Sequence, residues 1–252
     1  MGTKLATVDR ALAILRLFAG DEAEWTVENA IRELGLSQST AYQYFRSLVD
    51  AGLLSTYKTG RYVIGPAVIE LDRLTRLRDP LILAAHDEMD RLGAMLSNDD
   101  VVLLCRLYKL KVMCIDQRAP ASPRERVSYE RGRPMPLERG AASKVILAHL
   151  PPRALRRFYD QTYPRGIQPT WGEFREPLRL IRRAGLSITH GELDSGRVGV
   201  SAPVFGAEGD VIGSIGLVLS ESSLDCGEVS EAVCDTVIAA GRQVTAALRL
   251  EN

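Results

Sequence analysis

One stretch, residues 37–54, carries side chains that could hydrogen-bond to nucleic-acid bases. On a helix these residues would leave one face of hydroxyls, amides, a phenol and one guanidinium: Gln38, Ser39, Thr40, Tyr42, Gln43 and Arg46. A helix face that only meets solvent usually carries Glu and Lys. The groups found here can instead contact base edges and phosphates without repelling the phosphate charge. An ordinary surface helix is the alternative, and the flanking sequence decides between the two.

Two basic side chains follow this stretch. Runs 53–56 and 61–64 resemble short strands, and Tyr57-Lys58-Thr59-Gly60 joins them. A hairpin is therefore predicted, with Lys58 and Arg61 at its tip. In a winged helix-turn-helix, such a tip lies beside the phosphate backbone. We expect Lys58 and Arg61 to contact DNA phosphates.

A second group of residues could support metal binding or acid–base catalysis. His190, Glu192 and Asp194 place an imidazole and two carboxylates within five residues. The other histidines, His86 and His149, fall in predicted helices, where structural roles are usual. The chain has no P-loop, no GxGxxG fingerprint and no GxSxG elbow. We therefore expect no catalysis, no metal and no cofactor.

The four cysteines have no metal-binding spacing. They are Cys105, Cys114, Cys226 and Cys234, and they suit neither a zinc site nor a disulfide framework. The β-rich runs 101–107 and 112–117 flank a turn near residues 109–110, and this symmetry places Cys105 opposite Cys114. Two packed thiols are the expected outcome. A redox role for the pair stays open.

Length and composition indicate one large or two ordinary folded domains in a cytoplasmic protein. The chain has 252 residues, 46% of them hydrophobic, and 32 basic residues balance 32 acidic ones. No signal peptide and no apolar run of membrane-spanning length is visible. Residues 1–78 hold ten Lys or Arg against nine Asp or Glu. This small excess is a weak electrostatic signal and counts mildly against DNA binding.

The expected elements place the polar face on a helix-turn-helix. A helix from Thr7 should bury a stripe of five apolar residues: Val8, Ala11, Leu12, Leu15 and Phe18. Thr26 should cap a second helix, and Gly35 should turn the chain into a third helix that Ser37 caps. With the hairpin, residues 1–65 form a predicted winged helix-turn-helix domain. A three-helix bundle of another kind is the alternative.

The remaining sequence predicts a linker helix and a second domain. Residues 66–79 form a helix with more leucines than a spacer needs, Leu71 and Leu74 among them, so it could pack on a partner chain. Residues 80–252 alternate helices and strands irregularly, including hairpin-like runs 198–205 and 211–219 and a short strand near Val127. We expect an α+β chain whose second domain has a mainly antiparallel sheet flanked by helices.

With these motifs in order, the chain resembles the IclR family of bacterial transcriptional regulators. In the first domain the resemblance rests on residues 8–15, 36–42 and 60–65. In the second it rests on 135–137, 141–144, 191–192, 200–205 and 209–213. It implies a winged helix, a linker helix and a GAF/PAS-like effector-binding domain. It also implies dimers or tetramers that bind palindromic operators. We expect a repressor, although activation is not excluded, and nor is a DNA-binding protein without a ligand.

The resemblance also implies an effector pocket near residues 135–143. The expected pocket residues are Val127, Met135, Gly140, Ala141, Ala142, Thr189, His190, Gly199, Gly216 and Val218. Family members that bind small keto acids hold the carboxylate with an acid, a thiol and two hydroxyls. The matching positions here are Thr189, Gly199, Gly216 and Val218. A larger and less polar pocket is therefore expected, which suits an aromatic, benzoate-like effector with Thr189 or His190 at its polar end.

One position departs from the family pattern. Gln43 stands where the family often has an arginine. A glutamine can pair bidentately with adenine, whereas an arginine pairs with guanine. The operator is therefore expected to differ from those of close relatives.

Overall fold

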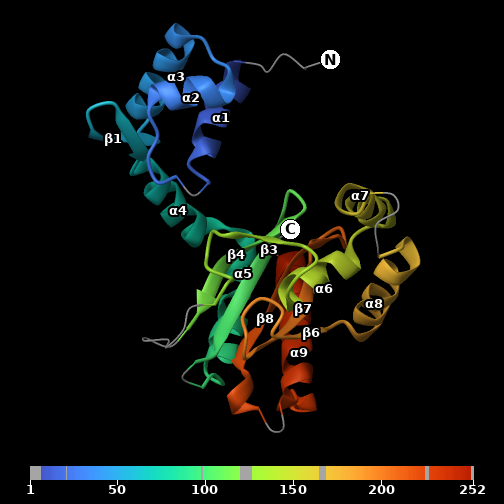
Figure 1. Ribbon diagram of the computed structural model, residues 1–252. Helices are drawn as coiled ribbons and strands as arrows, with labels where there is room; N and C mark the ends of the chain where they lie inside the picture. The colour runs from blue at the N-terminus through green and yellow to red at the C-terminus, as the bar shows by residue number, and fades with distance from the viewer. Residues whose placement is uncertain are drawn as a thin grey trace. The chain divides into compact units, whose positions relative to one another are not determined.

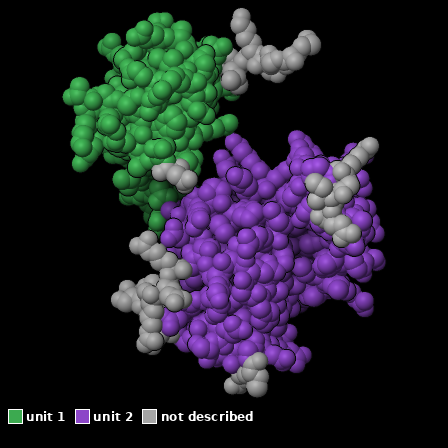
Figure 2. Space-filling model, in the orientation of Figure 1, with its two compact units in different colours: residues 1–77 green, residues 78–252 purple. Residues whose placement is uncertain are grey.

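The computed structural model describes residues 7–20, 22–97, 99–119, 127–164, 169–224 and 227–250. The chain divides into two compact units, residues 1–77 and 78–252 (Figure 2). Unit 1 holds helices α1 Thr7–Leu17, α2 Val27–Leu34, α3 Gln38–Asp50 and α4 Ala67–Arg78, and strands β1 Leu54–Lys58 and β2 Arg61–Ile64 (Figure 1). The last residue of α4 crosses the boundary between the units. Unit 1 is thus a helix-turn-helix with a hairpin wing, as predicted.

Local capping sets the ends of the helix-turn-helix. The Thr26 hydroxyl accepts a hydrogen bond from Asn29 N at 3.1 Å, and the Ser37 hydroxyl accepts one from Thr40 N at 3.3 Å. Gly35 follows α2 with φ 62°, a left-handed conformation that favours glycine. The turn therefore ends one helix and starts the next within three residues.

The core of unit 1 is centred on Ile14, Phe45 and Leu54. The predicted stripe of α1 is wrong at two positions, because Val8 and Leu12 are 68% and 45% exposed. Ile14 is the fully buried residue of α1, so the face that meets the core is rotated away from the predicted one. α4 buries none of its residues. A single chain therefore leaves apolar surface on α1 and α4 uncovered.

The wing is held to the segment between α1 and α2 by a strand-like contact at Trp25. Trp25 and Tyr62 exchange two backbone hydrogen bonds, Trp25 N to Tyr62 O at 3.0 Å and Tyr62 N to Trp25 O at 2.8 Å. The Tyr62 ring meets Phe45 of α3 edge-on, with centroids 4.7 Å apart. Arg61 forms an ion pair with Glu24. The wing is therefore braced against the α1–α2 segment and against α3.

Unit 2 is built on one antiparallel sheet. Its six strands lie in the order β5-β4-β3-β8-β7-β6. Their bounds are β3 Val101–Tyr108, β4 Lys111–Arg118, β5 Pro134–Pro136, β6 Ser187–His190, β7 Arg197–Phe205 and β8 Val211–Ser220. The predicted hairpins are β3–β4 and β7–β8. β5 and β6 were not predicted, and the strand expected near Val127 is wrong, because that residue belongs to no strand.

Helices cover both faces of this sheet (Figure 1). The helices of unit 2 are α5 Pro80–Gly93, α6 Ala141–His149, α7 Pro152–Thr162, α8 Trp171–Ala184, the short η1 Glu221–Ser223 and α9 Glu231–Leu250, and α8 packs on α6. α5 and α9 pack on the face that presents Val102, Leu104 and Ile215. α6 packs on the face that presents Leu103, Cys105 and Val218. The central strands β3 and β8 thus alternate their side chains between two apolar layers.

The predicted pairing of Cys105 with Cys114 is confirmed. The two residues are register partners in β3 and β4, and both are fully buried. A hydrogen bond with the Cys114 thiol and burial raise the pKa of Cys105, so it is a neutral thiol at physiological pH. Cys226 lies outside the described residues, and Cys234 is half-buried in α9.

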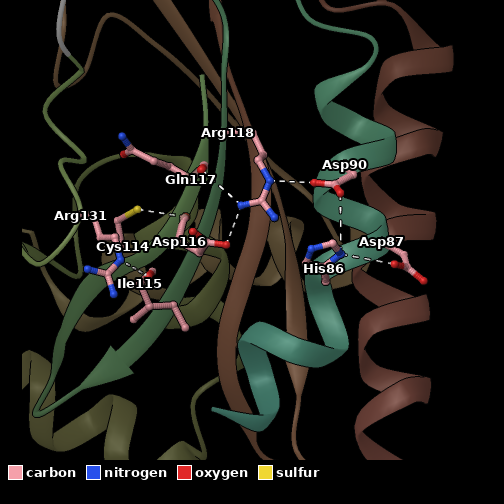
Figure 3. Close-up of polar contacts among 9 residues, drawn as sticks. All are labelled: His86, Asp87, Asp90, Cys114, Ile115, Asp116, Gln117, Arg118 and Arg131. Carbon is pink, nitrogen blue, oxygen red and sulfur yellow. Dashed lines mark hydrogen bonds and ion pairs between the residues drawn. The ribbon is translucent and has the colours of Figure 1, made fainter. Parts of the chain in front are cut away.

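Ion pairs tie α5 to the sheet. The Asp79 carboxylate caps α5 by accepting from Leu81 N at 2.9 Å, and it also accepts from both terminal nitrogens of Arg106 in β3, at 2.5 and 2.6 Å. At the other end of α5, Arg118 bridges Asp90 and Asp116 at 2.7 Å each (Figure 3). The Arg118 guanidinium lowers the pKa of Asp90. The helix is therefore fixed to β3 and β4 near both ends.

An aromatic cluster joins α7 and α8. The Tyr159 ring lies 5.2 Å from both Trp171 and Phe174, measured between centroids, and Trp171 stacks on Phe174 at 6.0 Å. The Arg156 guanidinium lies 5.0 Å from the Trp171 ring.

Within the described residues, no helix is both long and apolar enough to cross a membrane.

Candidate functional site

The outer face of α3 presents the side chains that the sequence singled out. Gln38, Ser39, Tyr42, Gln43 and Arg46 are exposed, and Thr40 is half-buried. The opposite face of α3 enters the core through four buried residues, namely Ala41, Tyr44, Phe45 and Leu48. The helix is therefore held by one side and offers the other to a partner.

Some of these side chains already have partners. The Tyr42 hydroxyl donates to Glu28 of α2 at 2.9 Å, and this bond raises the pKa of the Tyr42 phenol. Thr40 accepts from the Ser37 hydroxyl at 2.7 Å. In the part of the chain that the structure describes, the Gln38 and Gln43 amides make no side-chain hydrogen bond. The two glutamines are thus the groups freest to meet a base.

The two basic residues of the wing differ in their surroundings. Lys58 is exposed, and its ammonium lies 5.6 Å from the Tyr57 ring centroid. Arg61 is engaged by Glu24. Lys58 therefore presents its charge to solvent, whereas the charge of Arg61 is partly neutralised.

A cavity lies between α6 and the sheet in unit 2. Its volume is about 30 Å³ in this structure. Its lining residues come from four strands, α6 and the loops around them: Leu103, Tyr129, Gly140, Ala141, Ala142, Thr189, Glu192, Leu193, Asp194, Arg197, Gly199, Ser201, Leu217 and Val218. A space of this size holds about one water molecule, so an organic ligand would require the walls to move apart.

Six of the ten expected pocket residues line this cavity: Gly140, Ala141, Ala142, Thr189, Gly199 and Val218. Val127 and Met135 are buried in the surrounding core instead. His190 follows Thr189 on β6, so its side chain points to the opposite side of the strand, where it is exposed. The structure does not bring His190 to the cavity.

The two glycines of the expected pocket differ. At Gly199, an added Cβ would lie 3.0 Å from the Thr189 hydroxyl and 3.1 Å from Ala141 Cβ, so the missing side chain lets these two cavity residues pack closely against β7. At Gly216, it would lie 2.1 Å from the Val200 carbonyl oxygen. Gly216 is not among the lining residues. It allows two strands to approach, and it does not enlarge the cavity as expected.

Two hydroxyls point to the cavity. Thr189 and Ser201 are 7% and 3% exposed, and neither hydroxyl has a hydrogen-bond partner in the described ranges. Ser201 was not predicted, although it lies two residues beyond Gly199 and therefore on the same face of β7. That period of two could have identified it. Leu103 and Tyr129 were also missed.

The carboxylates of the segment 190–194 have structural partners. Glu192 accepts from Gly140 N at 3.0 Å and forms an ion pair with Lys144. Asp194 accepts from Ser128 N at 2.9 Å and from the Ser128 hydroxyl at 2.5 Å. Nowhere in the described part of the chain do three His, Cys, Asp or Glu residues group as metal ligands would. The segment closes the cavity next to the start of α6.

Comparisons with known proteins agree with this architecture. The model of the IclR helix-turn-helix domain matches residues 7–56, and that of the bacterial transcriptional regulator IclR C-terminal domain matches residues 77–246. The HTH-type transcriptional regulator KipR of Bacillus subtilis is 24% identical over 223 residues, which cover 86% of this chain and 87% of that protein. The glycerol operon regulatory protein of Streptomyces griseus is 26% identical, over 98% and 99% of the two chains.

A solved structure shares the fold. An IclR homologue from Microbacterium hydrocarbonoxydans, complexed with 4-hydroxybenzoate, superposes with a TM-score of 0.76 at 20% identity, covering 97% of this chain and all of that one. The two matching domain models together span most of the described elements. The chain belongs to the IclR family of bacterial transcriptional regulators.

Proposed function

We propose that this regulator is a repressor that acts in the cytoplasm and binds a palindromic operator as a dimer or tetramer. In this proposal residues 1–65 bind DNA, residues 66–79 link the domains, and residues 80–252 bind a small aromatic effector that releases the operator. The observation that carries the proposal is the exposed polar face of α3 beside a braced wing. That arrangement fits a helix in the major groove with the wing on the adjacent backbone.

The residues of α3 and the wing divide by role. Gln43 reads a base edge, because its amide is exposed and can both donate and accept. Gln38, Ser39, Thr40, Tyr42 and Arg46 contact bases and phosphates around it. Lys58 and Arg61 contact phosphates only, and they fix the position of the helix without reading sequence.

Apolar surface supports an oligomer. α4 exposes Ile69, Leu71 and Leu77 at 73%, 55% and 54%. Val8 and Leu12 on α1 are also exposed. Two helices with uncovered apolar stripes favour burial against a second chain. A two-fold dimer would present two α3 helices to two half-sites, as a palindrome requires.

The chemistry of the cavity lining supports an aromatic effector. Leu103, Leu193 and Val218 supply apolar walls, and the Thr189 and Ser201 hydroxyls supply the polar groups that fix orientation. The Microbacterium homologue, which shares this fold, was crystallised with 4-hydroxybenzoate. A flat aromatic ring is the kind of body that gains most from such walls.

Two variants test the DNA-binding proposal. Gln43→Ala should reduce discrimination between operator and random DNA by about 1–3 kcal/mol per half-site, because one base-edge contact is lost. Lys58→Ala should weaken binding to both DNAs equally and lessen its dependence on salt by roughly one counterion per half-site. Fluorescence anisotropy with an operator selected from random-sequence DNA measures both effects over a salt series.

The outcomes separate the roles. Arg179→Ala on α8 is the control, because its side chain is exposed and pairs only with Glu176 in the described structure, so no change is expected. If Gln43→Ala lost equal affinity for operator and random DNA, the base-reading role would be refuted. If neither variant changed DNA binding, the proposed surface would be wrong.

A further inference from the structure

A second concave surface of unit 2 lies between residues 238–249 of α9 and residues 203–205 of β7, with the end of α6 beside it. This α9 groove has a volume of about 340 Å³, which falls within the usual range for sites of small organic ligands. It shares no lining residue with the cavity between α6 and the sheet. The α9 groove is therefore a separate candidate for ligand binding.

The groove forms where β6 ends and α9 takes over the edge of β7. β6 pairs with β7 only as far as Ser201, so Pro203 and Phe205 lie beyond its last partner. The Thr245 hydroxyl of α9 accepts from Phe205 N at 3.1 Å, and Pro203 has no N–H to offer. Gly241 lets α9 approach this edge, because an added Cβ would lie 2.8 Å from the Pro203 carbonyl oxygen. An added strand would thus find no backbone donor at these two positions, and the side chains decide what the groove can bind.

The lining combines an apolar floor with positive charge. Its apolar side chains are Pro203, Phe205, Ile238 and Ala246. Arg242 and Arg249 are exposed and stand seven residues apart, which places them on one face of α9 with about 10 Å between them along the helix axis. Neither guanidinium has an acidic partner among the described residues, and no residue in the lining is acidic. The charge of the groove is therefore uncompensated.

The His149 imidazole extends the apolar floor. Its Nδ1 lies 2.8 Å from the Val145 carbonyl oxygen, which can only accept, so this nitrogen carries a proton. Burial lowers the pKa of His149, and the positive charge of Arg182 lowers it as well, whereas the bond to Val145 acts in the opposite direction. The ring is thus neutral at neutral pH and meets Phe205 edge-on, with centroids 5.3 Å apart. Arg182 adds a further positive charge near the groove.

An uncompensated guanidinium beside apolar surface suits a ligand with an apolar body and an anionic group. Arginine binds a carboxylate through two parallel hydrogen bonds, and an apolar body gains by covering the floor. The cavity between α6 and the sheet differs, because Glu192 and Asp194 belong to its lining. We propose that the α9 groove is a second ligand site, which binds an organic carboxylate with an apolar body independently of the effector cavity.

NMR of the histidine side chains tests this site directly. The chain has three histidines, and among them His149 lines the groove, so replacing each by glutamine in turn assigns the signals. With the full-length protein at about pH 7.5, added 2-naphthoate should move the His149 imidazole resonances. 2-Naphthamide has the same apolar body without the charge. It should bind about fivefold more weakly, which is the upper end for an exposed ion pair.

Four variants locate the response. Arg242→Gln should weaken 2-naphthoate binding, as followed at His149, by about fivefold and leave 2-naphthamide binding unchanged. Arg153→Gln is the control, because Arg153 is an exposed arginine of α7 without an acidic partner in the described part of the chain, and it should change neither. Ala246→Phe fills the groove from an exposed position and should abolish the response to both probes. Gly199→Ala, which disturbs the effector cavity, should leave the response intact.

Several results would overturn the proposal. Unmoved His149 resonances at millimolar 2-naphthoate, or equal affinities for the two probes, would show that the groove does not bind a carboxylate. A response that persists in Ala246→Phe, or that is lost in Gly199→Ala, would place the ligand elsewhere. Resonances of His149 that move with protein concentration alone would show that a second chain covers the groove.

Discussion

Gly199 controls the space beside the effector cavity. An added Cβ there would lie closer to Thr189 and Ala141 than ordinary van der Waals contact. In Gly199→Ala these neighbours must shift, at a cost of about 1–3 kcal/mol, so effector affinity should fall tenfold or more. Operator binding should persist, since the change lies in unit 2. Calorimetry and anisotropy measure the two effects.

Gly172→Ala is the matched control for that change. Gly172 lies in α8, and an added Cβ would meet nothing within 4 Å. This control should fold and bind effector normally. Unchanged effector affinity in Gly199→Ala would show that the effector does not occupy this part of the cavity.

Glu192 should make stability depend on pH. Its pKa in the folded state lies below 4.5, because Lys144 and Gly140 N outweigh the effect of burial. A depressed pKa adds stability above the unfolded value that is lost as pH falls through the folded value. The free energy of unfolding should therefore fall below pH 4.5, and less steeply in Glu192→Gln.

Urea unfolding followed by circular dichroism between pH 3 and 7 measures this slope. Glu208→Gln, in the exposed turn between β7 and β8, is the control and should show the same dependence of stability on pH as the unchanged protein. Equal slopes for Glu192→Gln and the unchanged protein would show that the Lys144 contact adds no stability.

Individual residues were predictable where the controlling contact is local. Thr26 and Ser37 were identified as caps because each bonds to a backbone N–H three residues ahead. The partners of Glu192 lie about 50 residues away in the chain, so no spacing rule could give them. Gly216 was misjudged because the carbonyl it accommodates belongs to another strand.

At the scale of elements, the start of α5 depends on one carboxylate. Asp79 accepts from the first N–H groups of α5 and from both terminal nitrogens of Arg106. Asp79→Ala removes a cap worth about 1 kcal/mol and a charged hydrogen-bonded pair worth about 1.5–3 kcal/mol. Urea unfolding should show that the free energy of unfolding falls by the sum of these two contributions.

The control for this prediction is an exposed ion pair. Arg156 and Asp160 lie four residues apart on α7, and both side chains are about half exposed. Asp160→Ala should cost roughly 0.5 kcal/mol or less. If Asp79→Ala and Asp160→Ala lowered the free energy of unfolding by equally small amounts, the Asp79–Arg106 contact would not fix α5 to the sheet.

Long, patterned elements were predicted better than short ones. The β3–β4 and β7–β8 hairpins carry eight to ten residues per strand, with clear turns between them. β5 has three residues and β6 has four, too few to show an alternating pattern. The face of α1 was misplaced because its apolar residues outnumber those that one chain buries.

At the scale of the whole molecule, the uncovered leucines of α4 predict self-association. Leu71→Asp together with Leu77→Asp should yield monomers, because charges cannot be buried in an apolar interface. Operator affinity should then fall sharply, since a single α3 reads only one half-site. Light scattering at micromolar concentration measures the mass.

Leu180→Asp is the control for that experiment. Leu180 lies on α8 and is 62% exposed, outside the surfaces of α1 and α4. It should leave the oligomer intact. A monomeric mass for the unchanged protein would rule out the proposed dimer.

The strand-like contact of Trp25 has a spectroscopic consequence. The chain has two tryptophans, and they lie in different units: Trp25 pairs with the wing, and Trp171 belongs to the α7–α8 aromatic cluster. Replacing either one by phenylalanine leaves a single fluorophore that reports on one unit. In these single-tryptophan variants, the emission of Trp25 can follow operator binding, and the emission of Trp171 can follow unfolding of the effector domain.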